Sequence, residues 1–277
     1  MALARGLLLA CHPLPCVAVT AFAVAYGYVV GADTHTLISI ALAVLAGQLC
    51  VGWSNDAIDD AADRLAARTD KPLARGVIGK RTVVLAAVMA GLVCVPLSLR
   101  LGTAPACLHI VAVLSALAYN AGLKTTVLSP IPYLLSFGLL PLVITLAVDD
   151  TQGPPALHVL AAVLLGGAAH FGNTIGDARA DAITGVHGLP QRLGPRRSQT
   201  VMALIIGTAA AVLLAEVFTT ADQRTGVRVL AAVLLIAGVA VAVSGALMQV
   251  GVRGGRSAWR LTLLAVGLVV AGFLIAA

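Results

Sequence analysis

Charged and aromatic residues are both scarce in this 277-residue sequence. Only 11% of the residues are charged and 4% are aromatic, whereas 60% are hydrophobic. A soluble domain usually carries about 25% charged residues, so this chain has too few to cover a water-facing surface. The net charge of +6 is spread over short segments between apolar runs. It does not form the basic patch typical of nucleic-acid binding, so we predict no nucleic-acid partner.

Cysteines are few and show no metal-ligand spacing. All five lie in or beside apolar segments, where a free cysteine is an ordinary small hydrophobic residue. We therefore assign them no function.

Long apolar runs predict the fold. A helix needs about 20 residues to cross a bilayer, and apolar windows of suitable length occur near residues 10–30, 34–54, 82–102, 104–121, 129–148, 156–174, 200–219, 227–249 and 258–277. We predict an all-α polytopic membrane protein of about nine transmembrane helices, with residues 1–277 forming a single domain.

The distribution of lysine and arginine predicts the orientation. If the N-terminus lies in the cytoplasm, the cytoplasmic segments hold 15 Lys and Arg residues and the opposite segments hold 3. This asymmetry follows the positive-inside rule for short loops. It places the N-terminus and both aspartate-rich loops in the cytoplasm of a cell-membrane protein.

The first aspartate-rich segment follows the second apolar run. If the helix continues past the membrane surface, Asp56, Asp59 and Asp63 share one face at i, i+3 and i+7. Carboxylates that share a face repel one another unless a cation lies between them, and oxygen ligands favour Mg²⁺, which substrate phosphates usually complete. Asp60 lies off this face, and we expect it to be solvated.

The second segment follows the sixth apolar run and repeats the pattern. His170, Asn173, Asp177 and Asp181 form one helical stripe that leaves the membrane on the same side. Two acidic helix ends that face each other would form a metal site at the membrane surface. The alternative is that these carboxylates are solvated loop residues, but polar stripes that continue into a span usually face a cavity or a partner.

Basic residues follow both acidic segments. A diphosphate carries more charge than one Mg²⁺ neutralises, so cationic side chains are expected beside it. We predict ligand contacts for Lys71, Arg75, Lys124 and Arg192; the alternative is that these residues only set the membrane topology.

These motifs resemble those of the UbiA family of intramembrane prenyltransferases. The resemblance covers essentially the whole chain. It rests on two aspartate motifs, Asn55-Asp56-x-x-Asp59-x-x-x-Asp63 and Asp177-x-x-x-Asp181. Four further segments are similar, namely His12-Pro13, Lys71-Pro72-Leu73-x-x-Gly76, Tyr119 with Lys124, and Leu189-Pro190-x-Arg192-Leu193-Gly194. One departure is Thr174, where many members have a further aspartate, and Asn173 compensates in part.

The resemblance implies a ring of helices around a lipid-accessible chamber, capped by the acidic loops. It implies that Mg²⁺ and an isoprenyl diphosphate are held by Asn55, Asp56, Asp59, Asp63, Asp177 and Asp181. Lys71, Arg75, Tyr119, Lys124, Asn173 and Arg192 are the further candidates for substrate contact. The implied reaction is prenyl transfer to a lipophilic acceptor, such as a quinone precursor, an aromatic ring or a lipid alcohol, among membrane lipids.

Two other functions remain open at this stage. A terpene cyclase of the same architecture would quench the allylic cation within its own chain. A transporter or lipid carrier would place ionisable groups near the middle of the bilayer, where Glu216 is the one remaining candidate. The clustering of acids at one membrane face favours an enzyme.

Overall fold

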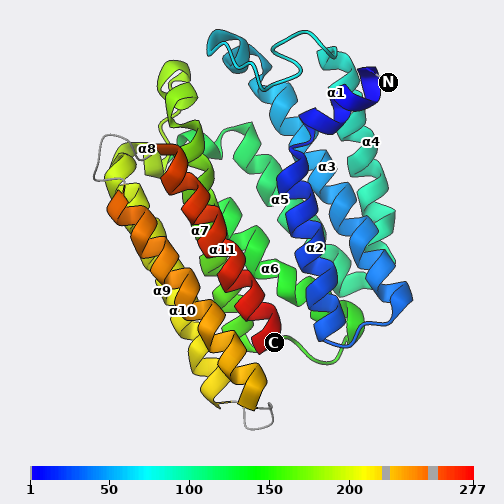
Figure 1. Cartoon of the computed structure of the whole chain (residues 1–277). Helices are drawn as coiled ribbons and strands as arrows, with labels where there is room; N and C mark the ends of the chain where they lie inside the picture. The colour runs from blue at the N-terminus through cyan, green and yellow to red at the C-terminus, as the bar shows by residue number, and fades with distance from the viewer. Residues whose placement is uncertain (1, 220–224, 249–254) are drawn as a thin grey trace.

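The computed structural model describes residues 2–219, 225–248 and 255–277, and within these ranges it contains helices and turns but no strand (Figure 1). The helices are α1 Ala2–Ala10, α2 Pro13–Val29, α3 Thr34–Leu65, α4 Lys80–Leu99, α5 Thr103–Ala121, the short 3₁₀ helix η1 Leu123–Thr125, α6 Ile131–Val148, α7 Ala156–Thr184, α8 Leu189–Leu193, α9 Pro195–Thr219, α10 Thr225–Met248 and α11 Gly255–Ala276. The predicted all-α membrane fold is confirmed.

The predicted count of nine spans is not confirmed by the described residues. In the part of the chain that the structure describes, seven helices are long and apolar enough to cross a bilayer. An eighth span results if α1 and α2, which meet at a bend of 66°, are counted as one. Residues Leu261–Ala276 of α11 form a shorter apolar helix, so the count of nine is not confirmed.

The helices are arranged so that the first and last membrane helices meet. Successive helices contact each other from α2 to α7, α9 packs on α7, and α11 contacts α7, α9, α10 and α2. In Figure 1, α9, α10 and α11 form one side of the bundle, and α2, α3 and α4 form the other. This closed order agrees with the predicted ring of helices, and the chamber inside it stays a prediction.

Apolar side chains lie both in the core and on the outer surface, as expected for a protein surrounded by lipid. The main core is built from small and branched residues of α2, α3, α6, α7, α9, α10 and α11. Large apolar side chains also face outward, for example Leu85 and Leu92 of α4 and Val233 and Ile236 of α10, all more than half exposed. Exposed apolar faces of this extent would be unfavourable in water and are favourable against acyl chains.

The α1–α2 bend presses the chain against the α3 helix. His12 at the bend has a left-handed backbone with φ 57°, and Pro13 begins α2. Gly52 of α3 faces this bend, and a Cβ atom added to it would lie 2.2 Å from the backbone oxygen of Cys11. A glycine is therefore required here for the bend to reach α3.

We predict that Gly52→Ala destabilises the protein by about 1–3 kcal/mol, because backbone atoms must move to admit the new methyl group. Thermal unfolding of the purified protein in detergent measures the effect. Gly207→Ala in α9 is the matched control, since an added Cβ there meets no atom within 4 Å. Equal unfolding temperatures for the two variants would contradict the close contact at Gly52.

Candidate functional site

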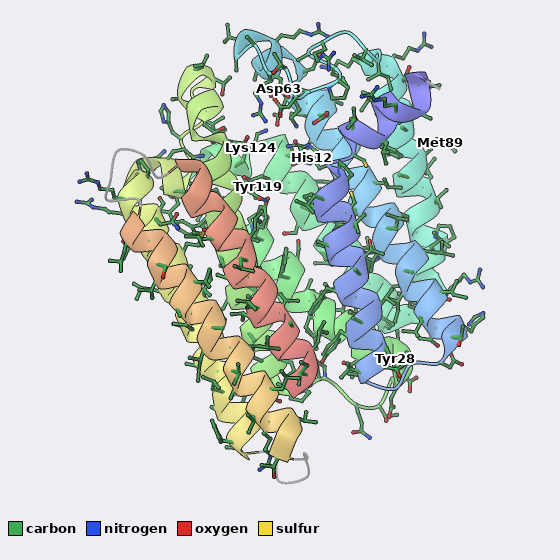
Figure 2. The ribbon with its side chains drawn as sticks, viewed as in Figure 1. His12, Tyr28, Asp63, Met89, Tyr119 and Lys124 are labelled. Carbon is green, nitrogen blue, oxygen red and sulfur yellow. The ribbon has the colours of Figure 1, made fainter. Side chains whose placement is uncertain are left out.

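The two aspartate-rich helix ends lie at the same end of the bundle. Figure 2 shows Asp63, His12, Lys124 and Tyr119 toward one end of the molecule, whereas Tyr28 lies at the other. Helix α3 runs 32 residues and continues past Asp63 without a break, as predicted from the spacing of its acids. Helix α7 is similarly long, with 29 residues, and contains the second acidic motif.

Asp56 is the most buried carboxylate of the cluster, with 1% of its surface exposed. Lys71 Nζ donates to Asp56 Oδ1 over 2.6 Å, and His12 Nε2 lies 2.9 Å from both groups. The second oxygen, Oδ2, is buried and has no hydrogen-bond partner among the described residues. A buried carboxylate oxygen without a donor is the position where a cation would be most favourable.

Asp59 faces the α5–α6 connection. It forms an ion pair with Lys124 through Oδ1 and accepts a hydrogen bond of 3.0 Å from Asn55 Nδ2 at Oδ2. Asn55 also donates to Asn120 Oδ1 over 3.2 Å, and Asn120 in turn donates to the backbone oxygen of Val51. The predicted Asn55, Asp59 and Lys124 are thus brought together, with Asn120 as an unpredicted support.

Asp63 and Asp60 differ from each other in their partners. Asp63 is 9% exposed, and its carboxylate accepts no hydrogen bond from any residue that the structure describes. The expectation that Asp60 is solvated is wrong, because it is also 9% exposed and pairs with Arg64 Nε at 2.8 Å. Arg64 lies one turn further along α3, so this pair stabilises the helix end.

Arg68 links the two acidic segments directly. Its guanidinium donates to Asp177 Oδ1 over 2.9 Å and to both oxygens of Asp70 over 2.9 and 2.7 Å. The hydrogen bonds from Arg68 lower the pKa of Asp70 to about 2, and the two carboxylates raise the pKa of Arg68. A cationic side chain therefore joins the loop that follows α3 to α7, and a metal site shared by the two acidic segments stays a prediction.

Asp181 is held by a neutral neighbour. Gln191 Nε2 donates to Asp181 Oδ2 over 2.7 Å. Burial raises the pKa of Asp181, and this hydrogen bond offsets part of the rise. The predicted Arg192 is not brought to the carboxylates, because its Nε donates to the backbone oxygen of His187 in its own loop.

Aromatic rings lie next to the acidic cluster. Tyr119 packs edge-on against Tyr133 and His170, with ring centroids 5.2 and 5.7 Å apart. Tyr133 stacks on Phe137 at 6.3 Å and accepts a hydrogen bond of 3.0 Å from Asn173. The predicted Tyr119 and Asn173 therefore meet through Tyr133.

His170 is fully buried, and Ser129 lies beside it. The Ser129 hydroxyl accepts from the backbone N–H of Leu189 over 3.0 Å and lies 3.1 Å from His170 Nε2. Ser129 thus ties the segment after the second motif to the α7 stripe.

Three site residues were missed from the sequence as ligand candidates. From the sequence, Arg68 was counted only among the basic residues that set the membrane orientation, although it lies between the two acidic motifs. Gln191 carries no charge that would draw notice. His12 could have been found from the sequence, because His12-Pro13 is one of the segments that resemble the UbiA family. The predicted Arg75 lies apart from the carboxylates, in a surface hollow with Arg5.

The donor set fits Mg²⁺. The cluster offers carboxylate oxygens from two helices and the amide oxygen of Asn55, which are the ligand types of a hard cation. No group of three or more Asp, Glu, His or Cys in the described residues is close enough to hold a metal by itself. Mg²⁺ commonly keeps waters and takes substrate phosphates as further ligands, so these side chains suit an ion that arrives with a diphosphate.

Comparison with known proteins relates most of the chain to one family. The sequence profile of the UbiA prenyltransferase family matches residues 14–261. A search of curated proteins found no match.

Solved structures with similar folds cover nearly the whole chain. A UbiA homologue from Archaeoglobus fulgidus bound to DMAPP and Mg²⁺ has a TM-score of 0.72 and 15% identity over 98% of each chain. A UbiA homologue from Aeropyrum pernix K1 has a TM-score of 0.69 and 22% identity over 91% of this chain and 96% of the other. A digeranylgeranylglyceryl phosphate synthase has a TM-score of 0.69 and 14% identity over 98% and 97%. At these identities the structural likeness shows the fold alone.

Proposed function

This chain belongs to the UbiA prenyltransferase family. We therefore propose that it transfers a prenyl group from an isoprenyl diphosphate to a lipophilic acceptor within the membrane, and that this reaction depends on Mg²⁺. The acceptor would be of the quinone-precursor, aromatic-ring or lipid-alcohol type. The acidic helix ends would lie on the cytoplasmic side, in keeping with the 15 to 3 distribution of Lys and Arg.

One observation carries the proposal. Arg68 joins Asp177 of α7 to Asp70 of the α3–α4 loop, more than 100 residues away in the chain. Lys71 and Lys124 pair with Asp56 and Asp59 of α3. Solvated loop carboxylates would not need one buried and one partly buried lysine–aspartate pair, because desolvating a charge is costly. Structures of the Archaeoglobus fulgidus homologue with DMAPP or GPP and Mg²⁺ support the same ligand class.

Asp56, Asp59, Asp63, Asp177 and Asp181 would hold Mg²⁺. When bound, the ion would supply charge neutralisation for the diphosphate and for the leaving group as the allylic C–O bond breaks. The unpartnered Oδ2 of Asp56 supports its role as a ligand.

The lysines would bind the diphosphate. Lys71 and Lys124 now pair with Asp56 and Asp59, and both ammonium groups carry further donors for phosphate oxygens. Held at fixed positions in a partly buried site, they would stabilise the charge that develops on the leaving diphosphate. Asn55 and Asn173 stay candidate diphosphate contacts.

The prenyl tail would lie inside the ring, below the aromatic group. Tyr119, Tyr133 and Phe137 present ring faces that can stabilise an allylic cation. Apolar helix surfaces would exclude water until the acceptor reacts. His170 lies among these rings with Nε2 beside Ser129 and its Nδ1 buried without a described partner.

The test is a product assay on purified protein with geranyl, farnesyl and geranylgeranyl diphosphates, with and without a membrane extract as the source of acceptor. We expect Mg²⁺-dependent release of diphosphate and a prenylated product that forms only when the extract is present. Mass spectrometry identifies the product, and a protein-free sample corrects for hydrolysis. A cyclic hydrocarbon formed without extract would show a terpene cyclase instead, and no Mg²⁺-dependent consumption of any diphosphate would overturn the proposal.

A further inference from the structure

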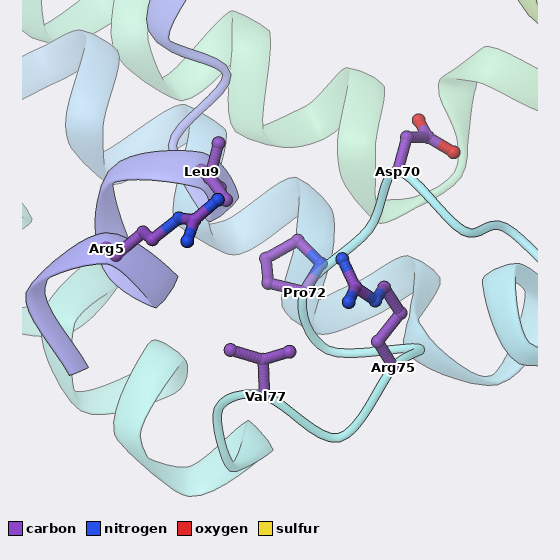
Figure 3. A pocket seen from close by; sticks show the side chains of 6 residues that line it. All are labelled: Arg5, Leu9, Asp70, Pro72, Arg75 and Val77. Carbon is purple, nitrogen blue, oxygen red and sulfur yellow. The ribbon is translucent and has the colours of Figure 1, made fainter. Parts of the chain in front are cut away.

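A second cationic feature lies outside the acidic cluster. Arg5 of α1 and Arg75 of the α3–α4 loop line a surface hollow of about 200 Å³, together with Leu9, Asp70, Pro72 and Val77 (Figure 3). In Figure 3 the two guanidinium groups lie on either side of Pro72 and both extend toward it, whereas the Asp70 carboxylate points away. The hollow is several times the roughly 30 Å³ that one water molecule occupies.

The walls of this hollow are fixed by packing. Leu73 and Ile78 of the loop are buried in a small apolar cluster with Ala10, Ala57 and Val83. Arg64 of α3 donates to the Leu73 oxygen over 2.7 Å. A tight turn at Gly76, with φ 70°, brings Val77 back so that its N–H donates to the Pro72 oxygen over 2.9 Å.

Helix α1 is fixed in the same way. Trp53 of α3 donates to the Leu7 oxygen over 2.9 Å. Gly6 packs so closely on the loop that an added Cβ would lie 3.2 Å from Ile78 Cβ. Arg5 and Arg75 are therefore presented by two segments that are packed against each other, and their spacing is set by the fold.

The positive charge of the hollow is not neutralised by its own walls. Arg5 and Arg75 are both exposed, and neither guanidinium group forms a hydrogen bond or an ion pair with the residues that the structure describes. Asp70 is the one acid in the lining, and both of its oxygens already accept from Arg68. An anion that entered the hollow would meet two unpaired guanidinium groups, which bind phosphate oxygens well.

The surroundings favour a lipid as the source of that anion. Helix α1 is turned by 66° from the membrane helix α2, and Leu3, Leu8 and Leu9 on it are 57%, 60% and 44% exposed. Helix α1 thus carries exposed leucines and an arginine and is not parallel to the membrane helix that follows it. Such amphipathic helices typically lie in the bilayer interface. We propose that the hollow binds the phosphodiester headgroup of an anionic phospholipid, with the acyl chains lying along the leucines of α1.

Native mass spectrometry of the detergent-purified protein tests the proposal, with phosphatidylglycerol and phosphatidylcholine of the same acyl chains as probes. We expect the wild type to retain phosphatidylglycerol preferentially. The double variant Arg5→Gln/Arg75→Gln should lower its affinity at least about tenfold, because each basic residue near an anionic lipid contributes to binding. Phosphatidylcholine binding should not change.

The matched control is Arg196→Gln/Arg197→Gln, which removes two exposed charges from the start of α9. It should change phosphatidylglycerol affinity less than about twofold. Equal losses in the two double variants, or no loss in Arg5→Gln/Arg75→Gln, would overturn the proposal. Displacement of phosphatidylglycerol by millimolar inorganic phosphate would also overturn it, because the hollow would then bind a free anion. Thermal unfolding measurements check that both double variants fold. If Arg5→Gln/Arg75→Gln does not fold, the same binding test is made with the single variants Arg5→Gln and Arg75→Gln.

Discussion

Asp177→Asn is expected to lower the rate of Mg²⁺-dependent diphosphate release at least about a thousandfold, because it removes a proposed charged metal ligand and the α7 partner of Arg68. The side chain is 50% exposed, and asparagine has almost the same size, so folding should be preserved. Release of diphosphate from farnesyl diphosphate in proteoliposomes, measured over a range of Mg²⁺ concentrations, gives the effect. Partial recovery at high Mg²⁺ would agree with weakened metal binding.

The prediction extends to a double variant. Asp56→Asn should cause a loss of similar size, and Asp56→Asn/Asp177→Asn should lose little more than either single variant, because ligands of one site act as a unit. Asp150→Asn is the control, since this exposed carboxylate follows α6 at the opposite end of the bundle. Full turnover in either single variant, or losses that multiply in the double variant, would contradict a shared site.

Lys124→Met should reduce kcat by about a hundredfold to a thousandfold, the loss typical when one group that stabilises developing charge is removed. Methionine keeps the length and apolar character of the lysine stem, so the packing around the partly buried side chain should be kept. Lys124→Arg should retain much more activity, since the guanidinium also donates to phosphate oxygens. Steady-state rates over a range of diphosphate concentrations separate kcat from KM.

The outcome distinguishes two roles for this lysine. If Lys124 only pairs with Asp59, Lys124→Met should lower the unfolding temperature and leave kcat nearly unchanged in the protein that remains folded. If it contacts the leaving group, kcat should fall while the unfolding temperature changes little. An unchanged kcat in Lys124→Met would therefore remove Lys124 from the proposed diphosphate site.

The helical framework could be predicted well because it depends on local sequence. Long apolar runs predict membrane helices, and the i, i+3 and i+7 spacing of Asp56, Asp59 and Asp63 predicts one acidic face on a helix that continues beyond the membrane. The structure confirms this extension in α3. The count of nine spans is not confirmed, and the bend at His12 depends on a close contact with Gly52 that no local pattern shows.

The site was only partly predictable because its contacts join distant segments. Asp60 was expected in solvent, yet Arg64 and the packed loop bury it. Arg75 and Arg192 carry the right charge for a diphosphate contact, but their backbone positions direct them elsewhere. Arg68, Gln191 and His12 reach the carboxylates because the loops fold back over the helix ends. The prediction that residues 1–277 form one domain stays a prediction.

The sequence by itself determined that this is a helical membrane protein with two acidic stripes, since hydrophobicity and helical spacing are properties of neighbouring residues. Only the tertiary structure decided which cation meets which carboxylate. Those pairings depend on how helices and loops far apart in the chain pack, and a charged side chain is positioned by the partners that offset its loss of hydration. Lys71 with Asp56 and Arg68 with Asp177 are such pairs.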